Sequence, residues 1–290
     1  MKTLVFSDIH HRHKTVQRII DSVEHDNVIL LGDYFDAFDD TVEEAVETAT
    51  WLKEYVLHNS KIVALIGNHD ASYIWKDNHY LRCSGYSDEK SAAINNILND
   101  SDMSKFKPYH IEHNHVFSHA GLSNAWWKVF SEKSTQNENE SKLQYFDRVM
   151  KYYVNIDIEK AKNNNDAPLF NAGWDRGGIQ RDGGINWVDW ENFAPINGVN
   201  QIVGHTTHSC PQICIQKIGG GLKKKDITEY YIDDLDKNEN YLSTSYGMDT
   251  ALRHYTMIED GDINIFHIEA NMNLKDVKNI YLPENPMNGF

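Results

Sequence analysis

The sequence predicts an α/β fold built on a largely parallel β-sheet with helices packed against it. Three short, continuously apolar segments alternate with two amphipathic segments over residues 2–66. Strands without polar alternation are buried on both faces, as in parallel sheets covered by helices. Polar residues follow each apolar segment, at the edge where such sheets build their sites. The first quarter of the chain therefore predicts both the fold class and the place of a functional site.

The three apolar segments, residues 2–7, 27–31 and 62–66, are predicted strands. A helix is expected between the first two, because apolar residues recur there at helical spacing: Val16, Ile19, Ile20 and Val23. A second, longer helix is expected before the third strand, and its apolar stripe comprises Val42, Ala45, Val46, Ala49, Leu52 and Val56. Asp40 or Thr41 would cap this second helix, since both side chains can accept a hydrogen bond from the first turn.

The middle of the chain is less regular. Residues 70–112 are polar with helix-like pieces, and residues 115–118 read as a short strand. A helical insertion lying over the site is predicted at about residues 123–168, on the basis of a Glu-, Lys- and Asn-rich stretch; the alternative is a solvated loop. Residues 198–203 lead into another strand end.

The last part of the chain alternates in a way typical of antiparallel strands. Strands are expected over residues 213–216, 227–232, 255–258 and 263–268, with a hairpin turn over residues 259–262. The basic run at residues 223–225 is expected to be an exposed hairpin loop and not a binding patch. At roughly 100–200 residues per domain, 290 residues allow one large domain or two modest ones, and we predict a single domain spanning residues 1–290.

Composition restricts the function. The chain has 28 basic and 43 acidic residues, a formal charge of −15, which disfavours long nucleic acids and anionic membranes as partners. No run of about 18 apolar residues occurs and the first charges come early, so neither a membrane span nor a signal peptide is expected.

Only 3 cysteines occur, which favours a reducing, cytoplasmic location. Cys210 and Cys214 could form half a zinc site, but ordinary thiols are the simpler interpretation.

Five polar motifs follow predicted strands, and together they carry the chemistry. In chain order they are Asp8-Ile9-His10, Gly32-Asp33-Tyr34-Phe35-Asp36, Gly67-Asn68-His69-Asp70, Ser118-His119-Ala120-Gly121 and Gly204-His205-Thr206-Thr207-His208. Each motif is weak alone. As a set they offer carboxylate, amide and imidazole donors, which suit manganese, iron, zinc or a similar divalent ion. The donors are too many for one ion, and they suit two ions that share a carboxylate.

The five motifs resemble the signature of the calcineurin-like metallophosphoesterase superfamily, which reads D-x-H, G-D-x-x-D, G-N-H-[D/E], H and G-H-x-H. The order and spacing match from Asp8 to His208. The resemblance implies a layered αββα sandwich with two mixed sheets flanked by helices. It also implies hydrolysis of phosphoesters with two divalent metal ions, manganese first and iron, zinc or nickel as alternatives. Such a pair activates water and clamps the oxygens of an in-line phosphoryl displacement.

The resemblance also assigns roles by position. The first metal would be held by Asp8, His10 and Asp33, and Asp33 would bridge to a second metal held with Asn68, His119 and His205. His208 would reach back to the first metal. His69 would protonate the leaving oxygen as general acid, oriented by Asp36. For Asp70 the simpler interpretation is a carboxylate that stabilises a turn.

Three further segments resemble the branch that contains bacterial and phage protein phosphatases and symmetrical diadenosine-tetraphosphate hydrolases: His119 to Ser123, Gly173 to Arg176 and Met248 to Ala251. The second implies that Arg176 binds phosphate through its guanidinium fork. The alternative is a surface arginine paired with Asp175 or Asp182.

The chain departs from the branch in three places. Ala37 and Phe38 stand where arginine and glycine usually follow the second motif, and the last motif has two residues between its histidines instead of one, which puts the role of His208 in question. In addition, His11, Arg12 and His13 replace the glycine that usually follows the first motif. His11 or Arg12 could therefore contact phosphate, or could belong to a solvated helix start.

The substrate predicted first is a phosphomonoester on a protein or small molecule. A nucleotide or dinucleoside polyphosphate comes second. A nuclease or phosphodiesterase comes third, because the acidic surface repels long polyanions. A non-catalytic metal-binding module is the rival from another class. A module could lose His69 or Asp33 without losing its packing, so the presence of both residues favours an enzyme.

Overall fold

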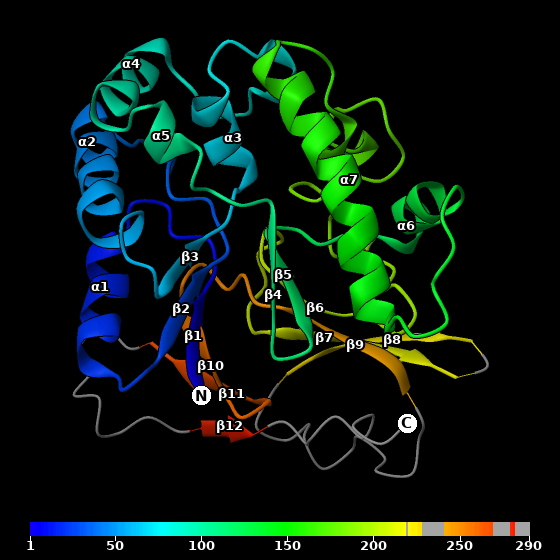
Figure 1. The fold of residues 1–290 in the computed structure, drawn as a ribbon. Coiled ribbons are helices and arrows are strands. Elements are labelled where there is room, and N and C mark those ends of the chain that lie inside the picture. The colour runs from blue at the N-terminus through cyan, green and yellow to red at the C-terminus, as the bar shows by residue number, and fades with distance from the viewer. Residues whose placement is uncertain (219, 228–240, 269–278, 282–290) are drawn as a thin grey trace.

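A computed structural model describes residues 1–218, 220–227, 241–268 and 279–281 of the chain. Two six-stranded sheets form the centre of the molecule, and helices flank them (Figure 1). Both sheets mix parallel and antiparallel pairs. The predicted layered α/β fold is confirmed.

The first sheet contains the three strands predicted from the start of the chain. These are β1 (Lys2–Phe6), β2 (Asn27–Leu30) and β3 (Ile62–Ala64), which pair in parallel. β10 (His254–Glu259) runs antiparallel to β1, and the sheet ends with β11 (Asp262–His267) and β12 (Asn279–Tyr281). The predicted hairpin over residues 259–262 is confirmed as the connection between β10 and β11.

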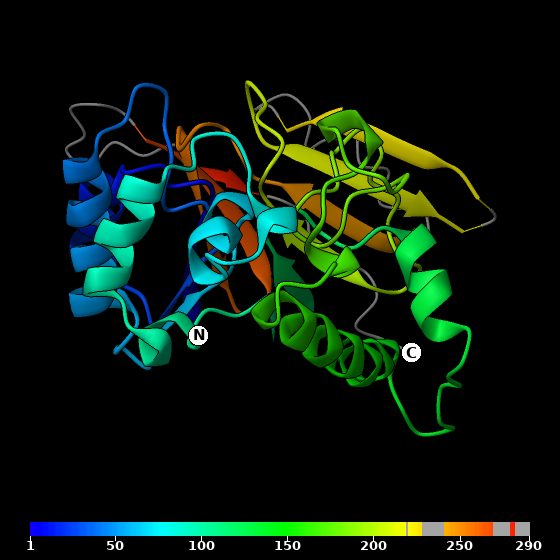
Figure 2. The same cartoon turned by 90° about the horizontal axis from the view of Figure 1, so that it is seen from above.

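Helices α1 (His13–Ser22) and α2 (Val42–Trp51) connect these strands, and α2 continues as a π-helical turn over Leu52–Val56. Of the two predicted caps, Thr41 is the one used: its hydroxyl accepts from the Glu44 N–H at 3.2 Å, while the Glu44 carboxylate accepts from the Thr41 N–H at 2.9 Å. Together with α4 (Asp88–Ile97), α1 and α2 lie on one side of the molecule in both views (Figures 1 and 2).

The segment predicted as polar with helix-like pieces contains α3 (Asn68–Ile74), a 3₁₀ turn (His79–Leu81), α4 and α5 (Asp100–Met103). It also ends in a strand that the sequence did not predict, β4 (Tyr109–Glu112), which pairs with the predicted strand β5 (His115–Ser118). β4 is an edge strand with half-buried residues, so it lacks the apolar run that identifies the central strands.

The second sheet has the order β4-β5-β6-β9-β7-β8. Its further strands are β6 (Asn200–Val203), β7 (Gln212–Lys217), β8 (Leu222–Asp226) and β9 (Tyr241–Gly247). Two findings correct the sequence analysis. The basic run at residues 223–225 lies in strand β8 and not in a loop, and β9 was not predicted. Except for Ile227, the strand predicted over residues 227–232 lies outside the described residues.

Helices α6 (Asn124–Ser131) and α7 (Lys142–Lys162) form within the range predicted for a helical insertion. They lie on the side of the molecule opposite α1 and α2 (Figures 1 and 2). Two 3₁₀ turns follow, Pro168–Phe170 and Trp174–Arg176. The end of α7 contacts the segment after α3, where the amide of Asn78 donates to the carbonyls of Ala161 and Asn165, each at 3.0 Å.

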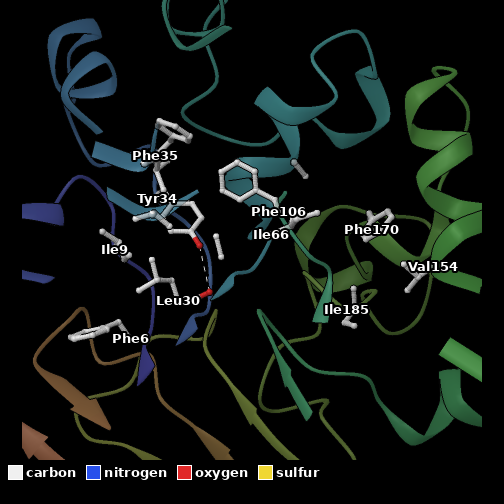
Figure 3. Close-up of a cluster of buried hydrophobic side chains, with 14 of the residues drawn as sticks. Phe6, Ile9, Leu30, Tyr34, Phe35, Ile66, Phe106, Val154, Phe170 and Ile185 are labelled. Atoms are coloured by element: carbon white, nitrogen blue, oxygen red, sulfur yellow. Dashed lines mark hydrogen bonds between the residues drawn. The ribbon is translucent and has the colours of Figure 1, made fainter. Parts of the chain in front are cut away.

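The first sheet separates two clusters of buried apolar residues, one on each of its faces. On β1, Leu4 and Phe6 pack in the cluster that includes the helices, whereas Val5 packs with residues of both sheets. Three apolar residues of the polar motifs, Ile9, Tyr34 and Phe35, belong to the first cluster, and so does Ile66, directly before the third motif (Figure 3). Their burial fixes the loops that carry the polar side chains.

No helix in the described ranges is long and apolar enough to cross a membrane. Cys83, Cys210 and Cys214 are all free thiols.

Candidate metal centre and active site

The strand register brings the five polar motifs together. In the first sheet the ends of β1, β2 and β3 are level, since Phe6 pairs with Leu30 and Leu30 with Ala64. In the second sheet β5, β6 and β9 are parallel and end together. The motifs that follow these strands therefore share one edge of the sandwich.

Two groups of potential metal donors form at this edge, and Asp33 belongs to both. Asp8, His10 and Asp33 have donor atoms within 4.8 Å of one another, and so do Asp33, His119 and His205. The Asp33 Oδ2 atom lies 3.7 Å from His10 Nε2 and 3.3 Å from His119 Nε2. One carboxylate oxygen is thus close to an imidazole nitrogen of each group.

Asn68 joins the second group through its side-chain oxygen. Its Oδ1 atom lies 2.9 Å from His119 Nε2 and 3.0 Å from His205 Nδ1. The remaining ring nitrogen of His205 is buried and has no hydrogen-bond partner among the described residues. The structure therefore brings six of the seven predicted ligands together.

The loops that carry these side chains have unusual backbone geometry. Positive φ angles occur at five motif residues other than glycine: Asp8 (33°), His10 (42°), Asp33 (52°), Asp36 (62°) and His205 (70°). Such conformations cost free energy and persist where the surrounding structure imposes them. Gly67 is also required by close approach, because a Cβ atom there would lie 2.0 Å from Asp33 Oδ1.

Asp70 holds two of the loops together. Its carboxylate accepts hydrogen bonds from the N–H groups of Asp33 (2.7 Å), Tyr34 (2.9 Å) and Gly67 (2.8 Å). Burial and the negative charge of Asp33 raise the pKa of Asp70 to about 7. Asp70 thus has the structural role expected of it, but it joins two motifs and not a single turn.

The buried carboxylates and imidazoles at this edge have shifted pKa values. Burial, followed by the charge of Asp249, raises the pKa of Asp8. At His119 burial opposes protonation, but the charge of Asp33, its hydrogen bond with the ring and the charges of Asp8 and Asp70 together outweigh burial and raise the pKa to about 9. Burial and the charge of His119 lower the pKa of His205 to about 3. Buried carboxylates and imidazoles of this kind are usually paired or bound to metal ions, so the donor set fits divalent metals.

His69 and Asp36 form a pair beside the first donor group. His69 Nδ1 lies 3.0 Å from Asp36 Oδ2, and its ring packs edge-on against that of His10. The other oxygen of Asp36 accepts from the hydroxyl of Tyr73 and the ammonium of Lys90, each at 2.6 Å. Although burial disfavours the charged imidazole, the charge of Asp33 and the hydrogen bond that His69 donates to Asp36 raise the pKa of His69.

His208 lies apart from the other predicted ligands. It belongs to neither donor group among the described residues, its Nε2 atom is buried without a partner, and its ring packs against Trp190. The neighbouring Asp249 carbonyl accepts from the His208 N–H at 3.0 Å.

Arg176 is paired, but not with either residue considered in the sequence analysis. Its Nε atom lies 3.0 Å from both carboxylate oxygens of Asp189, and its Nη2 atom lies 2.6 Å from Oδ1. The side chain is 44% exposed. Asp189 lies close enough to His205 for the two charges to interact, so the arginine stands beside the second donor group.

The residues expected to replace the usual arginine have structural roles. The guanidinium of Arg12 donates to three backbone carbonyls, those of Asp8, Ile9 and Ala251. The ring nitrogens of His11 lie 2.8 Å from Thr48 Oγ1 and 2.9 Å from Asp40 Oδ2. The polar atoms of both side chains therefore bond to other groups of the protein, and not only to solvent or to a phosphate ligand.

Sequence reasoning assigned no role to three residues near this site. Lys90 is buried between Asp36 and Asp40. It lies 54 positions after Asp36 in the chain, so no spacing in the sequence marks it. Asp189 was missed for the same reason. Asp249 follows the unpredicted strand β9, and only the segment from Met248 to Ala251 pointed to it.

A sequence profile of the calcineurin-like phosphoesterases matches residues 1–210. The chain belongs to the calcineurin-like phosphoesterase family. It is a metal-dependent phosphoesterase, and its substrates are phosphorylated compounds. No curated protein matches the chain in sequence.

A solved structure supports the fold of this phosphoesterase. A cold-active protein-tyrosine phosphatase of the psychrophile Shewanella sp. is similar with a TM-score of 0.51 and 14% identity, over 96% of this chain and 80% of that one. A metallophosphoesterase from Sphaerobacter thermophilus has a TM-score of 0.42 and 11% identity, over 93% of this chain and 89% of that one. At such identities the first likeness supports the fold alone.

Proposed function

We propose that this phosphoesterase hydrolyses phosphomonoesters, on proteins or small molecules, with two divalent metal ions that share Asp33. The observation that carries the proposal is the membership of Asp33 in both donor groups. Asp8 and His10 complete one group, and Asn68, His119 and His205 complete the other. When bound, the ions supply Lewis-acid activation of water and neutralisation of phosphoryl charge.

The protein holds the proton donor next to this centre. Asp36 accepts from His69 Nδ1, which leaves Nε2 as the atom that can donate to a leaving oxygen. Tyr73 and Lys90 fix the other oxygen of Asp36, so the carboxylate keeps its orientation toward the imidazole. The Asp33 side chain also accepts from the His69 N–H at 3.0 Å, which ties the acid to the shared ligand. An imidazolium kept in this position can protonate a poor leaving group, such as the alkoxide that leaves from an alkyl phosphate.

Arg176 is the proposed phosphate-binding residue. Its pair with Asp189 holds the guanidinium beside the second donor group, and the half-exposed side chain can reach solvent. A guanidinium offers several N–H donors in a fixed plane, so it can retain a carboxylate partner and still bind phosphate oxygens. Together with the segment from His119 to Ser123, this supports membership of the branch of bacterial protein phosphatases and diadenosine-tetraphosphate hydrolases.

The experiment compares hydrolysis of p-nitrophenyl phosphate and bis(p-nitrophenyl) phosphate with manganese added. Preferential cleavage of the monoester supports the proposal. Preferential cleavage of the diester indicates a phosphodiesterase or nuclease. A panel of nucleotides and dinucleoside polyphosphates then tests the second candidate class. If the enzyme prefers these compounds to the monoester, they take the place of a phosphomonoester as the proposed substrate.

Several expectations remain predictions. They are the single-domain division with its insertion at about residues 123–168, the identity of the ions as manganese, the role of His208 as a seventh ligand and the cytoplasmic location.

A further inference from the structure

A third donor group lies next to the proposed metal centre and shares no residue with its six ligands. It consists of Asp36, His69 and Cys83, whose donor atoms are within 4.8 Å of one another. We propose that this group is a separate, inhibitory site for a thiophilic divalent ion such as zinc. An ion bound there would replace the proton between His69 Nδ1 and Asp36, and would leave His69 a neutral, ion-bound ring that is a weaker acid than the imidazolium.

The donor chemistry separates this site from the proposed catalytic pair. A thiolate, an imidazole and a carboxylate are a usual ligand set for zinc, with a fourth position left to water. The groups around Asp33 offer only oxygen and nitrogen donors. Because a thiolate selects zinc over manganese, the two sites would prefer different ions.

Asp36 is already oriented for this role. Its Oδ1 atom accepts from Tyr73 and Lys90, whereas its Oδ2 atom faces His69 Nδ1. Oδ2 can therefore serve as a ligand without breaking the contact to Lys90. The ammonium also keeps Asp36 ionised, as a metal ligand must be.

Cys83 is held against the pair by its own loop. Its N–H donates to Ser72 Oγ at 3.3 Å, and its Sγ atom lies 3.6 Å from the Asn68 carbonyl. Two residues later the chain touches Asp36, because a Cβ atom on Gly85 would lie 2.8 Å from both Cβ and Cγ of Asp36. Cys83 and His69 are half-buried, so the group is accessible to a small ion.

Ion binding releases two protons in this scheme. The ion replaces the thiol proton of Cys83 and the proton that lies between His69 Nδ1 and Asp36 Oδ2. No oxidant or other reactant is needed. The inhibitory effect rests on the proposed function, since it requires His69 to be the proton donor; the site itself does not depend on that role.

Cobalt binding to the full-length protein tests the site directly. Cobalt is a spectroscopic substitute for zinc, and a thiolate ligand gives it a charge-transfer absorption in the near ultraviolet that oxygen and nitrogen ligands do not give. We expect this absorption in the wild type and in the control Cys210→Ser, and its loss in Cys83→Ser. Cys210 is a matched control because it is half-buried like Cys83 and belongs to no donor group among the described residues.

Absence of the absorption in the wild type, or its persistence in Cys83→Ser, would overturn the site. If Cys83→Ser does not fold, alkylation of the wild type followed by mass spectrometry gives the answer. Zinc should protect Cys83 and leave Cys210 reactive, and equal labelling of Cys83 with and without zinc would overturn the proposal.

Zinc titration of the manganese-loaded enzyme tests the inhibition, with each variant's activity expressed relative to its own zinc-free value. Cys83→Ser should require at least about tenfold more zinc for half-inhibition than the wild type or Cys210→Ser, because it lacks one ligand. Equal inhibition of all three would overturn the regulatory role. A missing cobalt absorption in a protein that still cleaves the monoester would reject the site and leave the proposed function intact.

Discussion

Asp33 Oδ2 lies 3.3 Å from His119 Nε2, although the two residues follow strands of different sheets. Asp33 comes after β2 in the first sheet, and His119 comes after β5 in the second. The donor groups thus form where the two sheets meet, and packing between the sheets fixes their separation. A change in the inter-sheet core should therefore affect metal binding as well as stability.

Replacement of His69 by asparagine should separate proton donation from metal binding. We expect kcat for an alkyl phosphate to fall by about 10²–10⁴, the usual contribution of a general acid, while metal content is preserved. The loss should be smaller with p-nitrophenyl phosphate, because its leaving group needs less protonation. The exposed His79 offers the control His79→Asn, which should keep its activity. Loss of metal from His69→Asn would show that the residue is a ligand.

Arg176→Lys should lower kcat/KM by about tenfold or more, because an ammonium replaces the charge but not the planar set of donors. Arg181→Lys is the matched control, since the side chain of Arg181 is 84% exposed and lies only five positions along the chain. Steady-state kinetics on the best monoester measures both. An Arg176→Ala enzyme with unchanged kcat/KM would remove this residue from the phosphate site.

Lys90→Met should destabilise the fold and impair catalysis together. The Lys90 side chain is 6% exposed and its ammonium pairs with both Asp36 and Asp40, so its removal leaves buried carboxylates without a cation. We expect the free energy of unfolding to fall by about 3 kcal/mol, measured by denaturant titration. The exposed Lys76 provides the control Lys76→Met, which should change little. A Lys90→Met protein as stable as the wild type would show that the carboxylates are stabilised in another way.

His205→Asn and His208→Asn should differ in metal content. His205 lies in the second donor group, so its replacement should reduce metal binding. His208 lies against Trp190 and apart from both groups, so the structure predicts a smaller loss for His208→Asn. Elemental analysis of both variants decides this. Equal losses would mean that His208 is a ligand, as the family motif implies.

The fold of about the first 70 residues was predictable, because the local sequence pattern of each element agrees with its place in the sheet. Strands β1, β2 and β3 are continuously apolar, and polar residues follow each of them, so the edge that carries Asp8, Asp33 and Asn68 can be inferred without coordinates. The histidines of the second sheet also follow predicted strands, and the family resemblance assigned them to the metal ions. Their convergence depends on the pairing of β5 with β6, which links residues far apart in the sequence.

Other parts were not predictable, for physical reasons. Strand β8 carries a run of lysines because it is an edge strand, where charged side chains prevent pairing with other chains; the same run suggests a loop when read alone. Lys90 resembles an ordinary helix-surface lysine in the sequence, and only tertiary packing places it against Asp36. The pairing of Arg176 with Asp189 also depends on the course of a loop that has no periodic pattern.

The central claim is that Asp33 is shared by two metal ions, and manganese reconstitution tests it most directly. Elemental analysis should find close to two ions per chain in the wild type, and electron paramagnetic resonance should show the exchange coupling of a bridged pair. In Asp33→Asn, which retains the shape but not the charge, the coupling should disappear and both sites should weaken. One ion per chain in the wild type, or a coupled pair that survives in Asp33→Asn, would contradict the account.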